Sequence, residues 1–190
     1  CLLEDDVMLI TYRGTDNTLV GWKEDFNMTF LDTIPSQKEA VQYLEAMAIA
    51  YPDRRIILCG HSKGGNLAVY AAAFCSFAIQ NRIQRVYNHD GPGFAAETLQ
   101  AAGYRSIAQR IETFVPQSSV VGMLMEHEEH YTVISSTQIS LWQHDPYSWE
   151  VLGPDFVRMD ALDRQSIVLD STIKHWISEL DRSQREAFTD

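Results

Sequence analysis

One serine in the sequence has neighbours that suit a nucleophile. Gly60, Ser62 and Gly64 form the pattern G-x-S-x-G within CGHSKGG. The apolar run 54–59 before it is typical of a buried strand, and the small and apolar residues 66–79 after it are typical of a buried helix. A strand that turns sharply into a helix at such a motif lifts the serine hydroxyl above the edge of the sheet. We therefore predict a nucleophilic Ser62, the alternative being a glycine-rich turn without chemistry.

A serine that attacks a carbonyl carbon needs hydrogen-bond donors for the oxyanion that forms. The N–H of Lys63 stands at the start of the predicted helix, where the helix dipole is positive. It is therefore predicted to be one half of an oxyanion hole. The reaction also needs a general base, and an imidazole titrates in the right range.

Strands and helices alternate along the chain, and these elements must position the serine. The expected strands cover 7–12, 54–59, 85–90 and 111–116, and the expected helices cover 36–51, 66–79 and 94–103. Ser36 and Glu39 have the spacing of a capping box at the start of the first helix. The alternation predicts an α/β fold with a mostly parallel sheet and helices on both faces.

The later part of the chain carries different patterns. The runs 130–135 and 138–142 predict a hairpin, and 164–182 has the apolar spacing of an amphipathic helix. We expect one domain over 1–190, a piece of a longer polypeptide trimmed at its N-terminus, with 164–190 as a helical extension. The apolar face of that helix could close the core or pair with a second copy in a homodimer.

Composition excludes several classes of partner. The 190 residues have a formal net charge of −11, which disfavours binding to the phosphates of nucleic acids. The sequence has no apolar run of about 18 residues, so no transmembrane segment is predicted. Cys1, Cys59 and Cys75 are scattered and lack metal-ligand spacing, which indicates reduced thiols and a cytoplasmic protein.

Four motifs together resemble a known family. They are YRGTDNTLVGWKEDF, GHSKGG, NHDGPGF and QHDPYSW, in that order along the chain. In order and spacing they resemble the class 3 lipase-like α/β hydrolases, and more closely the bacterial Mbeg1-like group. The resemblance covers about 7–149. It implies an α/β-hydrolase fold, a small-molecule ester or lipid substrate, and no cofactor.

The resemblance also assigns roles to individual residues. Thr15 matches the residue that follows Arg-Gly in the lipases and supplies the second oxyanion donor. His144 matches the late histidine of the family and follows the nucleophile and the acid in chain order, so it is the predicted base. His61, adjacent to the serine, is expected to be a packed residue.

The acid of the expected triad departs from the family pattern. The position that holds an aspartate in the lipases corresponds here to Ser119, which cannot stabilise an imidazolium as a carboxylate does. Asp90, at the carboxyl end of the preceding strand, is the candidate that orients His144. It could equally cap the turn that follows it. Asp145 is a third option, but its place next to His144 in the chain hinders contact with that ring.

These residues lead to a serine hydrolase that cleaves carboxylic esters through an acyl-enzyme on Ser62. A catalytically impaired scaffold or binding protein with the same fold is the alternative suggested by Ser119. An acyltransferase would use the same residues. The spacing of His127 and His130 in HEEH would suit a metal, but a polar loop beside a hairpin is the simpler interpretation, and no metal is expected.

Overall fold

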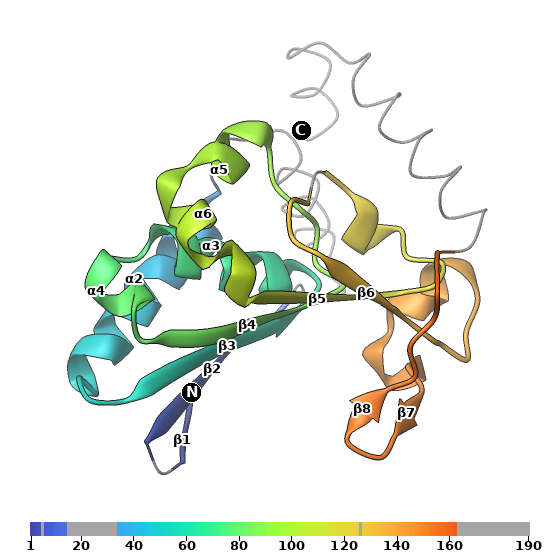
Figure 1. Ribbon diagram of the computed structural model, residues 1–190, viewed down its shortest axis with the longest axis horizontal. Helices are drawn as coiled ribbons and strands as arrows, with labels where there is room; N and C mark the ends of the chain where they lie inside the picture. Colours follow the sequence, from blue (N-terminus) through green and yellow to red (C-terminus); the bar gives the residue numbers. More distant parts are fainter. Residues whose placement is uncertain (5, 15–33, 126, 163–190) are drawn as a thin grey trace.

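Six strands form one sheet whose spatial order follows the order of the chain (Figure 1). The computed structural model describes residues 1–4, 6–14, 34–125 and 127–162. The strands of the sheet are β1 (Leu2–Glu4), β2 (Val7–Tyr12), β3 (Arg55–His61), β4 (Ile83–His89), β5 (Ile111–Pro116) and β6 (Tyr131–Ile134). β1 runs antiparallel to β2, and the strands from β2 to β6 pair in parallel. The carboxyl ends of the parallel strands therefore meet at one edge of the sheet.

The helices connect these strands. They are α2 (Pro35–Ala50), α3 (Lys63–Phe74), α4 (Phe77–Gln80), α5 (Ala96–Gln100) and α6 (Ala102–Ile107). Each connection between β2 and β5 moves one place in the same direction, and right-handed crossovers of this kind put their helices on one face. The predicted α/β class with a mostly parallel sheet is confirmed. Among the helices in the described residues, α2, α3 and α6 pack on one face of the sheet.

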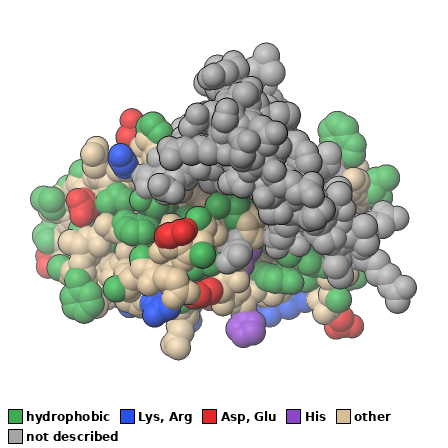
Figure 2. Space-filling view, turned by 90° about the horizontal axis from the view of Figure 1, so that it is seen from above, with side chains coloured by type: hydrophobic (Ala, Val, Ile, Leu, Met, Phe, Trp, Pro, Cys, Tyr) green, Lys and Arg blue, Asp and Glu red, His purple; other side chains and the backbone are tan. Residues whose placement is uncertain are grey.

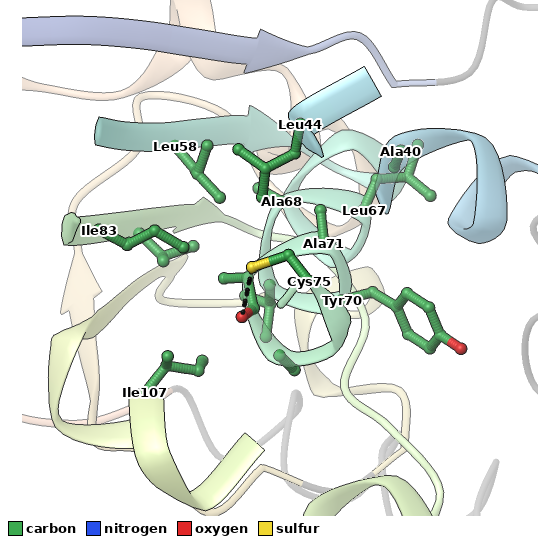
Figure 3. Packing of buried hydrophobic residues seen from close by; sticks show 14 of the residues in the cluster. Ala40, Leu44, Leu58, Leu67, Ala68, Tyr70, Ala71, Cys75, Ile83 and Ile107 are labelled. Atoms are coloured by element: carbon green, nitrogen blue, oxygen red, sulfur yellow. Dashed lines mark hydrogen bonds between the residues drawn. The ribbon is translucent and has the colours of Figure 1, made fainter. Parts of the chain in front are cut away.

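Helix α3 lies at the centre of the core, against β2, β3 and β4 on one side and α2 and α6 on the others. Its composition explains this position, because alanines such as Ala68 and Ala71, both fully buried, let the helix approach the strands closely. Larger side chains from the surrounding elements close around it (Figure 3), among them Leu44, Leu58 and Ile107. A helix packed on all sides holds its first residue in a fixed place at the sheet edge.

The capping box predicted at Ser36 and Glu39 is wrong. α2 begins one residue earlier, at Pro35, because a proline at the first helical position has a suitable φ and no N–H to satisfy. The side chain of Gln37 instead accepts a hydrogen bond from the N–H of Ile34 at 3.1 Å. The predicted helices also break: 66–79 becomes α3 and α4, and 94–103 extends into α5 and α6.

The hairpin predicted over 130–135 and 138–142 is wrong as well. β6 pairs in parallel with β5. The second run leads into a 3₁₀ helix, η3 (Ser140–His144), whose first residue, Ser140, has a positive φ. An apolar pattern of period two identifies a strand but not its partner. The 3₁₀ helix η4 (Pro146–Ser148) and the paired strands β7 (Val151–Leu152) and β8 (Asp155–Phe156) follow, below the sheet in Figure 1.

The connection from β5 to β6 contains the 3₁₀ helix η2 (Val121–Met123) and is anchored by a buried carboxylate. Glu129 accepts hydrogen bonds from Tyr104 in α6, Thr113 in β5 and His127 in the connection itself. Burial acts to raise its pKa, but the hydrogen bonds from His127 and Tyr104 prevail and hold the pKa at about 2. The connection is thus tied to the sheet and to α6.

On the face seen in Figure 2, charged side chains of both signs stand among apolar and neutral ones. Within the part of the chain that the structure describes, the helices are all too short or too polar to cross a bilayer.

Candidate functional site

Ser62 occupies the turn between β3 and α3 in a strained conformation. Its φ is 58° and its ψ is −133°, in a region that costs a residue with a Cβ about 1–3 kcal/mol. A serine before a helix ordinarily accepts a hydrogen bond from an N–H of the first turn, but the Ser62 side chain makes no such bond. The turn therefore leaves the hydroxyl for other contacts at the sheet edge.

Glycines on both sides of Ser62 allow the close packing that this turn requires. A Cβ on Gly64 would lie 2.2 Å from the carbonyl oxygen of Tyr12, and a Cβ on Gly60 would lie 2.1 Å from the carbonyl oxygen of Gly64. A Cβ on Gly14, just after β2, would come within 3.4 Å of the Ser62 Cβ. The end of β2 thus lies directly beside the serine.

Asp90 follows β4 at the same edge of the sheet and is fully buried. Its Oδ1 accepts hydrogen bonds from Ser119 Oγ at 2.5 Å and from the N–H of Gly122 at 3.1 Å. Its Oδ2 lies 2.7 Å from Nδ1 of His144. Three donors thus converge on one carboxylate, and one of them is the imidazole of the predicted base.

The contact with Asp90 fixes the tautomer of His144. A carboxylate accepts hydrogen bonds, so the proton between the two side chains belongs to Nδ1 of His144. Nε2 is then the unprotonated nitrogen of the neutral ring. No hydrogen bond joins Ser62 Oγ to His144 among the described residues. Such bonds are often long in a free enzyme and shorten when substrate binds.

His61 connects the two predicted catalytic residues. It is the last residue of β3 and precedes Ser62. Its Nε2 lies 2.8 Å from the carbonyl oxygen of His144, and because a carbonyl only accepts, His61 is the donor. The two imidazole rings also pack together, with centroids 4.6 Å apart. His61 is a packed residue, as expected, and its packing partner is the predicted base.

The pH dependence of stability should reflect the burial of His61. Burial lowers its pKa to about 4, whereas an unfolded histidine titrates near 6.5. Between these two values only the unfolded chain binds the proton, so stability is full above pH 6.5 and falls as the pH drops. We expect the free energy of unfolding to fall by about 1–2 kcal/mol between pH 7 and pH 5 because of His61, after allowance for its partial exposure. Urea unfolding of wild type and His61→Phe at both pH values checks this. Equal losses in the two proteins would contradict it.

Ser119, which matches the position of the lipases' aspartate, is hydrogen-bonded to Asp90, the predicted acid. Its hydroxyl, itself bonded to the N–H of Gly122 at 3.1 Å, donates to Asp90. Asp90 therefore reaches His144 from the neighbouring strand, and Ser119 supports it. The sequence alone could not reveal this exchange, because it depends on β4 and β5 lying side by side.

Removal of the Ser119 hydroxyl should weaken the site without abolishing it. In Ser119→Ala the carboxylate keeps its hydrogen bonds to Gly122 and His144. We therefore expect a loss of about 1–2 kcal/mol of stability and a fall of about 3–10-fold in the ester hydrolysis that the sequence predicts for this site. Chemical unfolding and steady-state kinetics measure the two effects. A loss of activity as great as that of an Asp90 variant would mean that Ser119 has a larger role.

Of the remaining predicted site residues, the structure describes Lys63 and Asp145 but not Thr15. Lys63 is the first residue of α3, so its N–H points out of the start of the helix beside Ser62. Thr15 and the predicted extension 164–190 lie outside the described residues. Asp145 accepts a hydrogen bond from the N–H of Tyr147 at 3.0 Å and caps η4.

The HEEH segment is part of the Glu129 anchor. Nδ1 of His127 lies 3.0 Å from Oε1 of Glu129. Over the ranges 1–4, 6–14, 34–125 and 127–162, no three histidine, cysteine or acidic side chains are grouped so that they could hold a metal ion.

The sequence was compared with known proteins and protein families. A search of the curated proteins found no match. A family model described as Mbeg1-like matches residues 2–190, a range that includes Ser62, Asp90 and His144. The chain belongs to the Mbeg1-like family.

Proposed function

We propose that this protein is a serine hydrolase that cleaves carboxylic esters through an acyl-enzyme on Ser62. The observation that carries the proposal is the 2.7 Å contact between Nδ1 of His144 and the buried Asp90, at the sheet edge where Ser62 is held. The lipase-like family resemblance supports the same reaction. A buried carboxylate behind an imidazole is the arrangement that activates a serine hydroxyl.

In the acylation step, Ser62 Oγ attacks the ester carbonyl and Nε2 of His144 takes its proton. Asp90 stabilises the imidazolium that forms, and Ser119 and Gly122 hold Asp90 in place. The N–H of Lys63, together with Thr15, binds the oxyanion of the tetrahedral intermediate. The imidazolium then gives its proton to the leaving alcohol, and the acyl group remains on Ser62.

Water completes the cycle by the same route. His144 removes a proton from water, which attacks the acyl carbonyl, and the acid product leaves as Ser62 regains its proton. An acyltransferase would differ only in using another acceptor in place of water.

The contact between Asp90 and His144 also weighs against a catalytically impaired scaffold. That alternative rested on Ser119 in place of the usual acid. A scaffold without catalysis would have no need of an imidazole held by a buried carboxylate, nor of a strained Ser62 at the same edge of the sheet.

Ester hydrolysis by the folded protein tests the proposal. We expect turnover of p-nitrophenyl esters across a series of acyl lengths, with an initial burst of about one nitrophenolate per enzyme when deacylation is the slower step. Ser76→Ala is the matched control, since Ser76 is exposed at the far end of α3 and makes no side-chain cap. Hydrolysis no faster than in buffer, for every ester and with folded protein, would overturn the proposal.

A further inference from the structure

The segment that carries His144 lies outside the main sheet. It comprises η3 and η4, and exposed side chains such as Ile139, Trp142 and Tyr147 line it. Asp90 holds the ring of His144, but a ring held only at Nδ1 can still swing about that bond if its backbone shifts. The position of the backbone at His144 therefore decides whether Nε2 faces Ser62.

One side chain ties that backbone to the strand that ends at the nucleophile. His61 donates from Nε2 to the carbonyl oxygen of His144 across 83 residues of sequence. The His61 ring packs on the His144 ring, and its centroid lies 5.9 Å from that of the Trp149 ring. Trp149 in turn donates to the carbonyl oxygen of Gln143. The carbonyls of Gln143 and His144, adjacent in η3, thus accept hydrogen bonds from two packed rings, those of Trp149 and His61.

The charge state of His61 also suits this place. Burial lowers its pKa to about 4, so the ring is neutral where an ester hydrolase would work. A neutral ring can lie against His144 without opposing the positive charge that His144 gains during acylation. A permanently charged side chain at the same distance would oppose that charge.

We propose that His61 is a positioning residue, which sets the distance between His144 and Ser62 by its hydrogen bond to the His144 carbonyl and by ring packing. This role rests on the proposed esterase function. It predicts that His61 acts on the rate through His144 and leaves substrate binding unchanged.

Two substitutions separate the hydrogen bond from the packing. Gln places an amide N–H near the position of Nε2, so His61→Gln retains the donor without the ring. His61→Phe retains a flat ring without the donor. We expect kcat to fall about 10-fold in His61→Phe, and about threefold in His61→Gln, with KM within about twofold in both.

His89 offers a matched control. It is a partly buried histidine on the neighbouring strand, its pKa is also lowered by burial, and its Nδ1 lies 3.3 Å from a backbone carbonyl, that of Gly60. Its ring lies against Phe114, and its centroid is 6.1 Å from that of Trp149, but it is not hydrogen-bonded to the His144 carbonyl, which His61 holds. His89→Phe should leave kcat within about twofold. A fall equal to that of His61→Phe would show that loss of any buried histidine has the same effect.

A double substitution tests whether His61 acts through the base. In a His144→Ala background the residue that His61 positions is gone, so addition of His61→Phe should lower the remaining rate no further. Multiplied losses in the double variant would overturn the proposal. Full activity in His61→Phe would overturn it equally.

A spectroscopic measurement keeps the proposal testable if no ester is hydrolysed. The Nδ1 proton of His144, held by Asp90, should give a protected imidazole N–H resonance in the wild type. We expect it to broaden or disappear in His61→Phe and to persist in His61→Gln and His89→Phe. An unchanged resonance in His61→Phe would overturn the positioning role, whereas absent hydrolysis with the expected resonances would overturn only the esterase function.

Discussion

Asp90→Asn is expected to lower kcat for ester hydrolysis about 10³–10⁴-fold while the protein stays folded. The amide oxygen of Asn can accept from Ser119 and Gly122 as Oδ1 does now. The amide nitrogen then faces His144 and, being a donor, needs Nδ1 as its acceptor. The imidazole proton must move to Nε2, and in that tautomer the ring cannot take the proton of Ser62. Steady-state kinetics and a chemical unfolding curve measure the two parts of this prediction.

The backbone at Asp90 makes Asn a fair replacement. Its φ is 52°, in the left-handed region that Asp and Asn tolerate better than most residues. Asp145→Asn is the matched control, because it removes the carboxylate next to His144 in sequence, one that is exposed and bonds to Tyr147 instead. We expect its kcat within about threefold of wild type. Equal losses of kcat in the two variants would contradict this role, because they would show that any negative charge near His144 has the same effect as Asp90.

Ser62→Gly is expected to abolish ester hydrolysis and at the same time to stabilise the fold. Without the hydroxyl no acyl-enzyme can form, so kcat should fall by at least about 10⁴-fold, by comparison with the loss of a triad serine in other hydrolases. Without the Cβ, the positive φ of residue 62 loses its strain. Relief of about 1–3 kcal/mol, less the entropy that glycine adds to the unfolded chain, leaves a net gain of about 1 kcal/mol.

Ser62→Ala separates the two effects. It also lacks the hydroxyl but keeps the Cβ, so its activity should be lost and its free energy of unfolding should stay close to that of wild type. Urea unfolding at one pH compares the three proteins. A glycine variant less stable than the alanine variant would contradict the strained turn.

Local patterns were enough to predict the strands β2 to β5 of the parallel sheet and the turn at Ser62. The runs 7–12 and 111–116 match β2 and β5 at both ends, because a buried parallel strand needs a continuous apolar run and little else. The turn at Ser62 could be predicted for a similar reason, since the glycines, the strand and the helix all lie within a few residues of it. The predicted start of α2 at Ser36 was wrong, because Pro35 suits the first helical position better than Ser36 suits the N-cap position.

The contacts between distant residues could not be predicted with the same certainty. Whether Asp90 caps a turn or orients His144 depends on a loop 54 residues further along the chain. Ser119 looked like a lost acid, and its hydrogen bond to Asp90 follows only from the adjacency of β4 and β5. The alternation of β3 places His61 on the face away from the helices, but nothing nearby in the sequence indicates that His144 packs there.

A covalent label on the nucleophile tests the central claim most directly. A fluorophosphonate reacts with a serine only when a base activates it, and mass spectrometry of the digested protein locates the adduct. We expect one phosphonyl group on Ser62 in the wild type and in Ser76→Ala, a much slower reaction in Asp90→Asn, and none in Ser62→Ala. Folded wild-type protein that remains unlabelled, or that carries the label on another serine, would contradict the account.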